Sequence, residues 1–100
     1  MHYGISIMAT LLTTDAIQSK LSELPDWSLN GKTITCTRTF KNFIAAVDFV
    51  NRLVEPAEAA GHHPDLAISY NKVVIELSTH DAGGLTEKDF ALAQTISAID

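Results

Sequence analysis

The chain has 100 residues, 46% of them hydrophobic and 19% charged, which fits one globular domain over residues 1–100 and is too short for two. Its formal net charge is −5, and the whole excess lies in residues 51–100, which contain eight acidic and three basic residues. This acidic balance argues against nucleic acid or a membrane surface as a partner, because both select basic patches.

A helix is the first predicted element. Apolar side chains recur at helical spacing over residues 15–24, Thr14 is a suitable N-cap, and Pro25 is expected to end the helix. We expect residues 1–13, ahead of this helix, to form a loose N-terminal extension.

Two antiparallel strands follow, joined by a hairpin turn at Asn30 and Gly31. The second strand covers residues 33–39, where threonine alternates with other side chains, and this period of two predicts one buried and one exposed face. The strand contains Cys36, the single cysteine, which excludes an internal disulfide framework and a thiolate zinc cluster. A lone cysteine is compatible with a reducing, cytoplasmic location.

The longest predicted element is a helix over residues 41–60, and Gly61 is expected to end it. Its apolar residues recur at helical spacing, which predicts a stripe that faces the core. The residues of the predicted stripe are Phe43, Val47, Val50, Val54 and Ala57.

A second hairpin and a last helix complete the predicted fold. The hairpin strands cover residues 66–70 and 73–79, and Asn71 between them is the expected left-handed residue. Thr86 and Asp89 resemble a capping box for a helix that runs to the C-terminus. The order α-β-β-α-β-β-α predicts an α+β fold, with two layers: a four-stranded antiparallel sheet and helices on one of its faces.

Three of the four histidines gather at one end of this predicted fold. His62 and His63 leave the end of the long helix, and His80 leaves the last strand of the second hairpin. Loops on a rigid scaffold are where functional residues concentrate. The carboxylates expected beside the three imidazoles belong to Glu58, one helical turn before His62, and to Asp65, Asp81 and Asp89.

Each of these residues also has a plain structural interpretation, because a single histidine is often a cap or a surface group and Trp27 is typical of a core. A zinc or iron site is a chemical alternative, since imidazole and carboxylate are ligands of both metals. The chain has no H-E-x-x-H motif, however, and the adjacent His62 and His63 tend to point apart. We therefore expect no metal, and we favour proton transfer by histidine near neutral pH.

The spacing of these residues is specific. The string Glu58-x-x-x-His62-His63-Pro64, with Tyr70, His80 and Asp89 after it, resembles the signature of the pterin-4a-carbinolamine dehydratase family. Three further runs resemble that family: Tyr70-Asn71-Lys72-Val73, Leu77-Ser78-Thr79-His80 and Gly84-Leu85-Thr86-Glu87-Lys88-Asp89. The resemblance extends from about residue 14 to the C-terminus, and the predicted order of elements agrees with the family's fold.

The resemblance implies an enzyme that eliminates water from 4a-hydroxytetrahydropterin to give quinonoid dihydropterin, which recycles the pterin cofactor of aromatic amino acid hydroxylases. It also implies work without a metal or other cofactor, and assembly as a homodimer or homotetramer. Some animal members bind a homeodomain transcription factor. Gly61 and Lys88 depart from the animal pattern, which often has an acid and an arginine there, and this affects substrate contacts rather than the reaction class.

We accordingly expect His63 and His80 to be an acid–base pair, His62 to position the substrate and share proton transfer, and Glu58 to orient or charge a histidine. The expected substrate-binding residues are Trp27, Gly61, His62, His63, Ser78, Thr79, His80, Asp81, Lys88 and Asp89. Two alternatives stay open: a non-enzymatic dimerisation module for a regulatory protein, and a metal-dependent lyase.

Overall fold

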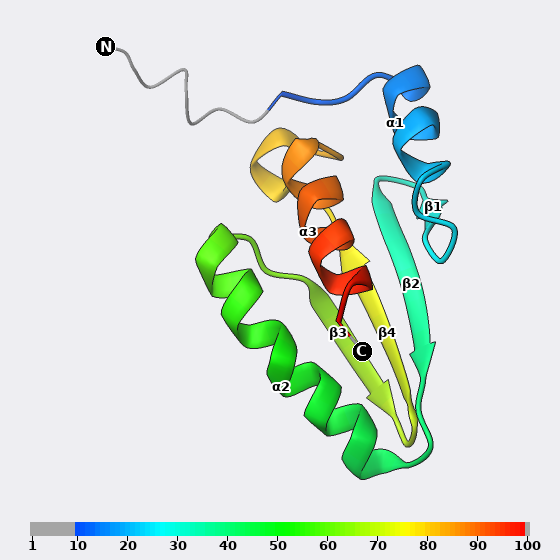
Figure 1. Ribbon diagram of the computed structural model, residues 1–100. Coiled ribbons are helices and arrows are strands. Elements are labelled where there is room, and N and C mark those ends of the chain that lie inside the picture. The colour runs from blue at the N-terminus through cyan, green and yellow to red at the C-terminus, as the bar shows by residue number, and fades with distance from the viewer. Residues whose placement is uncertain (1–9, 100) are drawn as a thin grey trace.

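The computed structural model describes residues 10–99. Its elements are α1 (Thr14–Leu21), β1 (Ser28–Asn30), β2 (Thr33–Thr39), α2 (Phe43–Ala60), β3 (Asp65–Ser69), β4 (Lys72–Leu77) and α3 (Glu87–Ser97), drawn in Figure 1. A short 3-10 turn at His80–Ala82 lies between β4 and α3. The predicted order α-β-β-α-β-β-α is confirmed.

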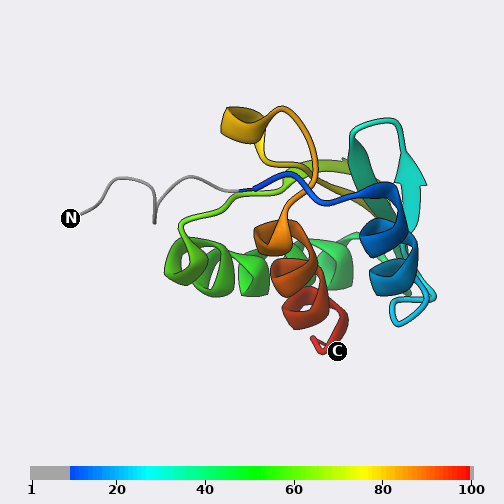
Figure 2. The ribbon, with the colours of Figure 1, turned by 90° about the horizontal axis from the view of Figure 1, so that it is seen from above.

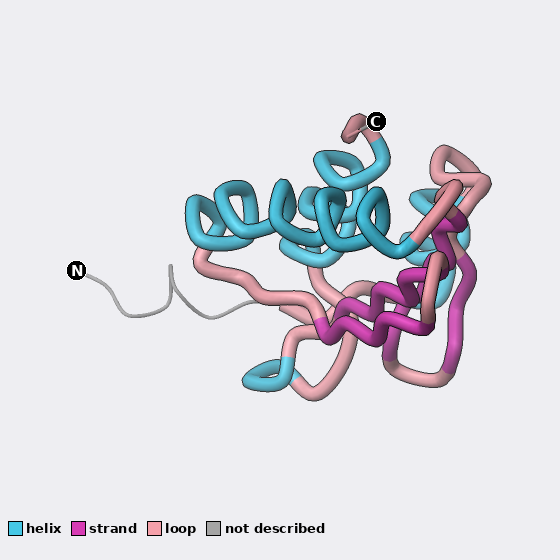
Figure 3. Tube along the Cα trace, turned by 90° about the horizontal axis from the view of Figure 1, so that it is seen from below, coloured by secondary structure: helices cyan, strands magenta, loops and turns pink. Residues whose placement is uncertain are grey.

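The four strands form one antiparallel sheet in the order β1-β2-β4-β3, so β2 and β4 are central and β1 and β3 are the edges. The three α-helices cover one face of the sheet, as the view from above shows (Figure 2). The view from below shows the same two layers, with the 3-10 turn standing apart from the helices (Figure 3). The predicted α+β architecture is therefore confirmed.

The alternation predicted for residues 33–39 holds in β2. Ile34 and Cys36 are buried, while Thr37 and Thr39 are exposed on the opposite face. Cys36 pairs with Ile75 of β4, which is also buried, so the two central strands present one continuous apolar face to the helices.

The buried stripe of α2 differs from the predicted one. Its buried residues are Ala46, Phe49, Leu53 and Ala57. The prediction was wrong for Phe43 and Val54, which are 52% and 58% exposed, whereas Val47 and Val50 are half-buried. The helix is apolar around most of its circumference, so periodicity alone allows several faces to point inward. Phe49 is fully buried against Phe40, with the ring centroids 5.0 Å apart.

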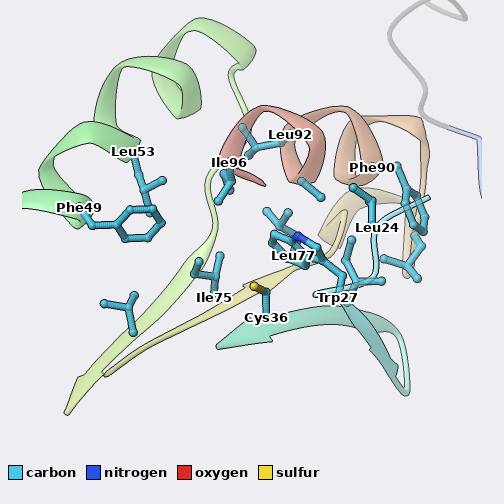
Figure 4. Packing of buried hydrophobic residues seen from close by; sticks show 14 of the residues in the cluster. Leu24, Trp27, Cys36, Phe49, Leu53, Ile75, Leu77, Phe90, Leu92 and Ile96 are labelled. Atoms are coloured by element: carbon cyan, nitrogen blue, oxygen red, sulfur yellow. The ribbon is translucent and has the colours of Figure 1, made fainter. Parts of the chain in front are cut away.

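The core lies between the sheet and the helices, and Figure 4 shows its packing. Trp27 is part of this cluster, and its indole Nε1 donates to Ser97 Oγ of α3 at 2.8 Å. That hydrogen bond satisfies the only polar atom of a side chain that is 4% exposed. Trp27 thus ties the start of β1 to the end of α3.

Two local predictions were wrong by one residue. Thr13, not Thr14, is the N-cap of α1, because its Oγ1 accepts from Ala16 N at 3.1 Å. In the second hairpin Tyr70, with φ of 53°, is the left-handed residue. Asn71 is held instead by Phe40, whose carbonyl accepts from Asn71 Nδ2 at 2.8 Å.

The expected loose extension over residues 1–13 falls mostly on residues 1–9, which lie outside the described residues. Leu12 is fixed, since its side chain packs against the core and its N–H donates to Leu85 O at 2.9 Å. Within residues 10–99 no helix combines the length and apolar character that crossing a bilayer requires.

Candidate functional site

Three segments that are distant in sequence meet at one end of the molecule. They are the turn after α2, the segment after β4 and the start of α3. Between them lies a cavity of about 260 Å³ that is open to solvent. The cavity is lined by Gly61, His62, His63, Ser78, Thr79, His80, Asp81 and Lys88. All eight were predicted as substrate-binding residues from the sequence, and the fold brings them together.

The end of α2 sets the direction of the two adjacent histidines. Gly61 is the predicted stop and takes the left-handed conformation, with φ of 60° and ψ of 31°. The N–H of His62 reaches back to Ala57 O at 3.1 Å, and that of Gly61 to Glu58 O at 3.1 Å. This closed turn holds the backbone of His62 against the helix end and directs the chain toward β3.

His62 points inward. Its side chain is 10% exposed, and its Nε2 lies 2.6 Å from Oδ1 of the fully buried Asp89. A carboxylate and an imidazole at this distance form a short, charge-assisted hydrogen bond when either is charged. Because His62 lines the cavity and Asp89 does not, the ring bridges the buried carboxylate and the cavity.

His63 points the other way. Its Nε2 lies 2.5 Å from Glu58 Oε2, and both side chains are largely exposed. The sequence placed Glu58 one turn before His62, yet the carboxylate pairs with the neighbouring His63. The left-handed turn at Gly61 explains this, because it breaks the helical register that an i, i+4 contact requires.

The segment after β4 supplies the opposite wall of the cavity. Thr79 pairs with Gly84 in a small bridge, with Thr79 N donating to Gly84 O at 2.9 Å. This bridge closes the loop that contains His80, whose exposed side chain starts the 3-10 turn. His80 is therefore fixed at its backbone while its imidazole stays accessible to a ligand.

The start of α3 provides the buried anion of the site. The predicted capping box is confirmed: Thr86 is the N-cap, and the Asp89 carboxylate accepts from Thr86 N at 2.9 Å. Asp89 Oδ2 also accepts from Thr79 Oγ1 at 2.8 Å. Asp89 was predicted to touch substrate, and the structure places it behind His62 with no exposure.

Trp27, predicted as an apolar wall for substrate, lies in the core and not among the residues that line the cavity. Thr86, predicted only as a helix cap, is also a residue of the site. Its side chain is 1% exposed and its Oγ1 lies 2.8 Å from Thr79 Oγ1. The capping-box pattern itself was the available signal, since it places Thr86 beside Asp89.

The imidazoles do not converge on one centre. His62 faces Asp89 and His63 faces Glu58, so the two adjacent rings are bound to different carboxylates. Among residues 10–99, no three histidine, cysteine or acidic side chains are arranged to hold a metal ion. The described site offers separate proton donors and acceptors around one small cavity.

Comparison with known proteins gives a consistent result. Residues 10–99 match the family model for pterin 4 alpha carbinolamine dehydratase. A protein of Cyanothece sp. that bears the family's name is 67% identical over 92 residues, which are 92% of this chain and 95% of the relative. One of Nostoc sp., named in the same way, is 61% identical over 93 residues, which are 93% of this chain and 100% of the relative.

Solved structures show the same fold. A transcriptional coactivator/pterin dehydratase from Brucella melitensis superposes with a TM-score of 0.82 and 34% identity, over 87% of this chain and 95% of that one. A pterin dehydratase-like protein, described as a RuBisCO assembly factor in the alpha-carboxysome, superposes with a TM-score of 0.62. It is 24% identical over 73% of this chain and 87% of that chain, so this similarity supports the fold alone.

Proposed function

The chain belongs to the pterin 4 alpha carbinolamine dehydratase family, and from this premise we propose that it eliminates water from 4a-hydroxytetrahydropterin. The substrate that we propose is 4a-hydroxytetrahydrobiopterin, and the product is quinonoid dihydropterin, which a reductase can return to tetrahydrobiopterin. The observation that carries the proposal is the cavity with His62, His63 and His80 on its walls.

The reaction needs two proton transfers. The bond between carbon 4a and its hydroxyl breaks, and the departing oxygen takes a proton from a general acid to leave as water. A general base removes the proton from N5, and the electron pair of that N–H bond becomes the new double bond between N5 and carbon 4a. Histidine suits both roles near neutral pH, because its imidazole gives or takes a proton there.

We assign His63 and His80 as the acid–base pair. Both side chains are exposed at the rim of the cavity, where a bound ring can reach them. Glu58 Oε2 lies 2.5 Å from His63 Nε2 and so holds the imidazole in place at the rim. His62, held by Asp89, positions the substrate and shares in proton transfer.

The cavity supports a pterin as ligand. At about 260 Å³ it lies just below the usual range of ligand sites, which suits a flat two-ring heterocycle whose side chain stays in water. The amide-like edge of a pterin needs donors and acceptors, and the half-buried Ser78 and the backbone of residues 78–81 can supply them. The Lys88 ammonium at the cavity edge can contact a carbonyl oxygen.

We also propose that the chain acts as a homodimer or homotetramer in the cytoplasm. The edge strand β3 is exposed along its length, and Leu66 and Ile68 are 39% and 41% exposed. Leu66 borders an apolar groove of about 200 Å³ between β3 and α2, lined chiefly by apolar residues of α2. An unpaired edge beside an apolar groove is covered well by the same edge of a second copy.

A second candidate function is a non-enzymatic binding module for a regulatory protein. It is favoured by the name of the Brucella relative, a transcriptional coactivator as well as a pterin dehydratase, and by the same apolar groove. In that function the α2 surface matters and proton transfer by the three histidines does not, although His63 also lines the groove.

A direct assay separates these possibilities. Purified protein is mixed with chemically generated carbinolamine, and the loss of the 4a-hydroxy compound is followed against its spontaneous dehydration. We expect acceleration that persists in the presence of a chelator. Acceleration that a chelator abolishes and zinc or iron restores supports the metal-dependent lyase, and no acceleration at all supports the binding module.

A further inference from the structure

Asp89 carries a buried negative group whose hydrogen bonds can be followed atom by atom. It has no exposure, and its two oxygens contact three donors. Oδ1 is occupied by His62 Nε2, and Oδ2 by Thr79 Oγ1 and Thr86 N. Buried polar groups are costly unless each is bonded, so these contacts fix the proton positions among them.

The direction of the threonine contacts follows from counting protons. The hydroxyl of Thr79 has one proton, and it goes to Asp89 Oδ2 at 2.8 Å. The contact of 2.8 Å between Thr79 Oγ1 and Thr86 Oγ1 therefore needs the proton of Thr86. Thr86 Oγ1 in turn accepts from Lys88 N at 3.2 Å, which is its capping role. The hydrogen bonds therefore run in one direction, from the Thr86 hydroxyl to Thr79 and from the Thr79 hydroxyl to Asp89.

The Asp89 end of this series of hydrogen bonds determines which ring nitrogen of His62 carries the proton. An ionised carboxylate only accepts hydrogen bonds, so Nε2 of His62 carries the proton that lies on Asp89 Oδ1. In the neutral form of the ring, the lone pair is then on Nδ1. Within residues 10–99 no hydrogen bond occupies that nitrogen, and the ring lines the cavity, which leaves Nδ1 for a ligand.

We propose that Thr79 and Thr86 are positioning residues, which hold Asp89 by a directed hydroxyl chain and so keep His62 in the Nε2-protonated tautomer. The N-cap of α3 thus has two roles: it caps the start of the helix and fixes the proton of a site histidine. Thr79 lines the cavity, but its hydroxyl is committed to Asp89, so this side chain serves the histidine rather than the substrate. The catalytic part of this inference rests on the proposed dehydratase function, whereas the tautomer does not.

Thr79 allows a clean test because its backbone role is separate. The bridge to Gly84 uses only main-chain atoms, so Thr79→Val removes the hydroxyl and keeps shape and bridge. Thr79→Ser restores the hydroxyl. The matched control is Thr95→Val, because Thr95 Oγ1 donates to Ala91 O at 3.2 Å on the exposed side of α3.

The first measurement is the ¹⁵N chemical shift of the His62 ring nitrogens in each full-length protein without ligand. We expect the Nε2-protonated tautomer in the wild type, in Thr79→Ser and in Thr95→Val, and a mixture in Thr79→Val. The second measurement is turnover with carbinolamine, for which we expect a fall of about tenfold in kcat for Thr79→Val, little change in KM, and recovery in Thr79→Ser.

An unchanged tautomer and unchanged kcat in folded Thr79→Val would overturn the proposal. If Thr79→Val does not fold, the wild-type spectrum tests the proposal by itself. A His62 ring protonated on Nδ1 in the wild type would contradict the assigned hydrogen-bond directions. If the wild type has no dehydratase activity, the proposed function fails while the tautomer shifts still test the hydroxyl chain.

Discussion

Nε2 of His62 lies 2.6 Å from Oδ1 of Asp89, and this contact joins residues that are 27 positions apart in sequence. It connects the C-terminal end of α2 to the first turn of α3. The carboxylate lies at the N-terminus of α3, where the helix dipole and the free N–H groups favour negative charge. The site therefore takes its fixed anion from a helix cap.

The first prediction concerns this anion. Asp89→Asn keeps the shape of the side chain and removes its charge, so the hydrogen bonds from Thr79 and Thr86 are weakened and the His62 ring loses its acceptor. We expect kcat to fall by roughly 10- to 100-fold and the free energy of unfolding to fall by about 1–3 kcal/mol. Turnover and urea unfolding measure both, with the exposed Asp48→Asn of α2 as control. Equal losses of kcat and of stability in the two variants would show that Asp89 has no special role.

The second prediction concerns the acid–base pair. His63→Ala and His80→Ala should each lower kcat by about 10²- to 10⁴-fold, the range for loss of one acid–base group. Both side chains are exposed, so the circular dichroism spectrum and the melting temperature should change little. Asn51→Ala, exposed on α2, is the control. If both histidine variants fold and turn over at the wild-type rate, the assignment is incorrect.

The third prediction separates Glu58 from the histidine it contacts. Glu58→Gln keeps a hydrogen-bonding side chain beside His63 but replaces the carboxylate that holds its ring by the weaker acceptor of a neutral amide. We expect a loss of kcat by a factor of about ten or less, smaller than that of His63→Ala. The pair is largely solvent-exposed, so stability should be unaffected. Glu55→Gln, three residues earlier on the same helix, should have no effect. Equal rates for Glu58→Gln and Glu55→Gln would mean that Glu58 is an ordinary surface residue.

The fourth prediction concerns the buried thiol. Burial raises the pKa of Cys36, the Asp26 carboxylate acts in the same direction, and Arg38 acts against both. The folded protein therefore holds the thiol proton more tightly than the unfolded chain. Its stabilising effect is complete below the unfolded thiol pKa of about 8.5 and is lost as pH rises through the higher folded value.

Urea unfolding between about pH 7 and about pH 10 tests this linkage. The free energy of unfolding should fall more steeply with pH in the wild type than in Cys36→Ala, which lacks the titrating group. A thiol reagent should also react far more slowly with the native protein than with the unfolded one. Parallel pH profiles for the two proteins would show that Cys36 contributes nothing to this dependence.

The fifth prediction concerns assembly. Light scattering at micromolar concentration should give a multiple of the chain mass of 10.8 kDa. Ile68→Lys places a charge on the exposed edge strand β3 and should shift the mass toward that of one chain. Ser28→Lys, on the opposite edge strand β1, should leave the mass unchanged. A wild-type mass equal to that of one chain would contradict the proposed assembly. Equal masses for the two variants would show that the interface does not involve β3.

Short-range sequence patterns were sufficient to predict several strands and helix ends of this protein. The period of two in residues 33–39 predicted β2 and its buried face, because successive side chains of a strand point to opposite sides. Gly61 and the capping box of Thr86 and Asp89 predicted the ends of two helices, because each needs only residues within one turn. The eight residues that line the cavity could also be named, but this used the resemblance to the dehydratase family and not local patterns alone.

Contacts between distant segments were decided only by the tertiary structure. The sequence could not choose between several apolar faces of α2, because that choice depends on what the sheet presents to Phe49 and Leu53. It could not separate the roles of two adjacent histidines, one buried on Asp89 and the other exposed on Glu58. Such pairings depend on where the ends of α2, β4 and α3 meet in space, and no periodicity within a single element carries that information.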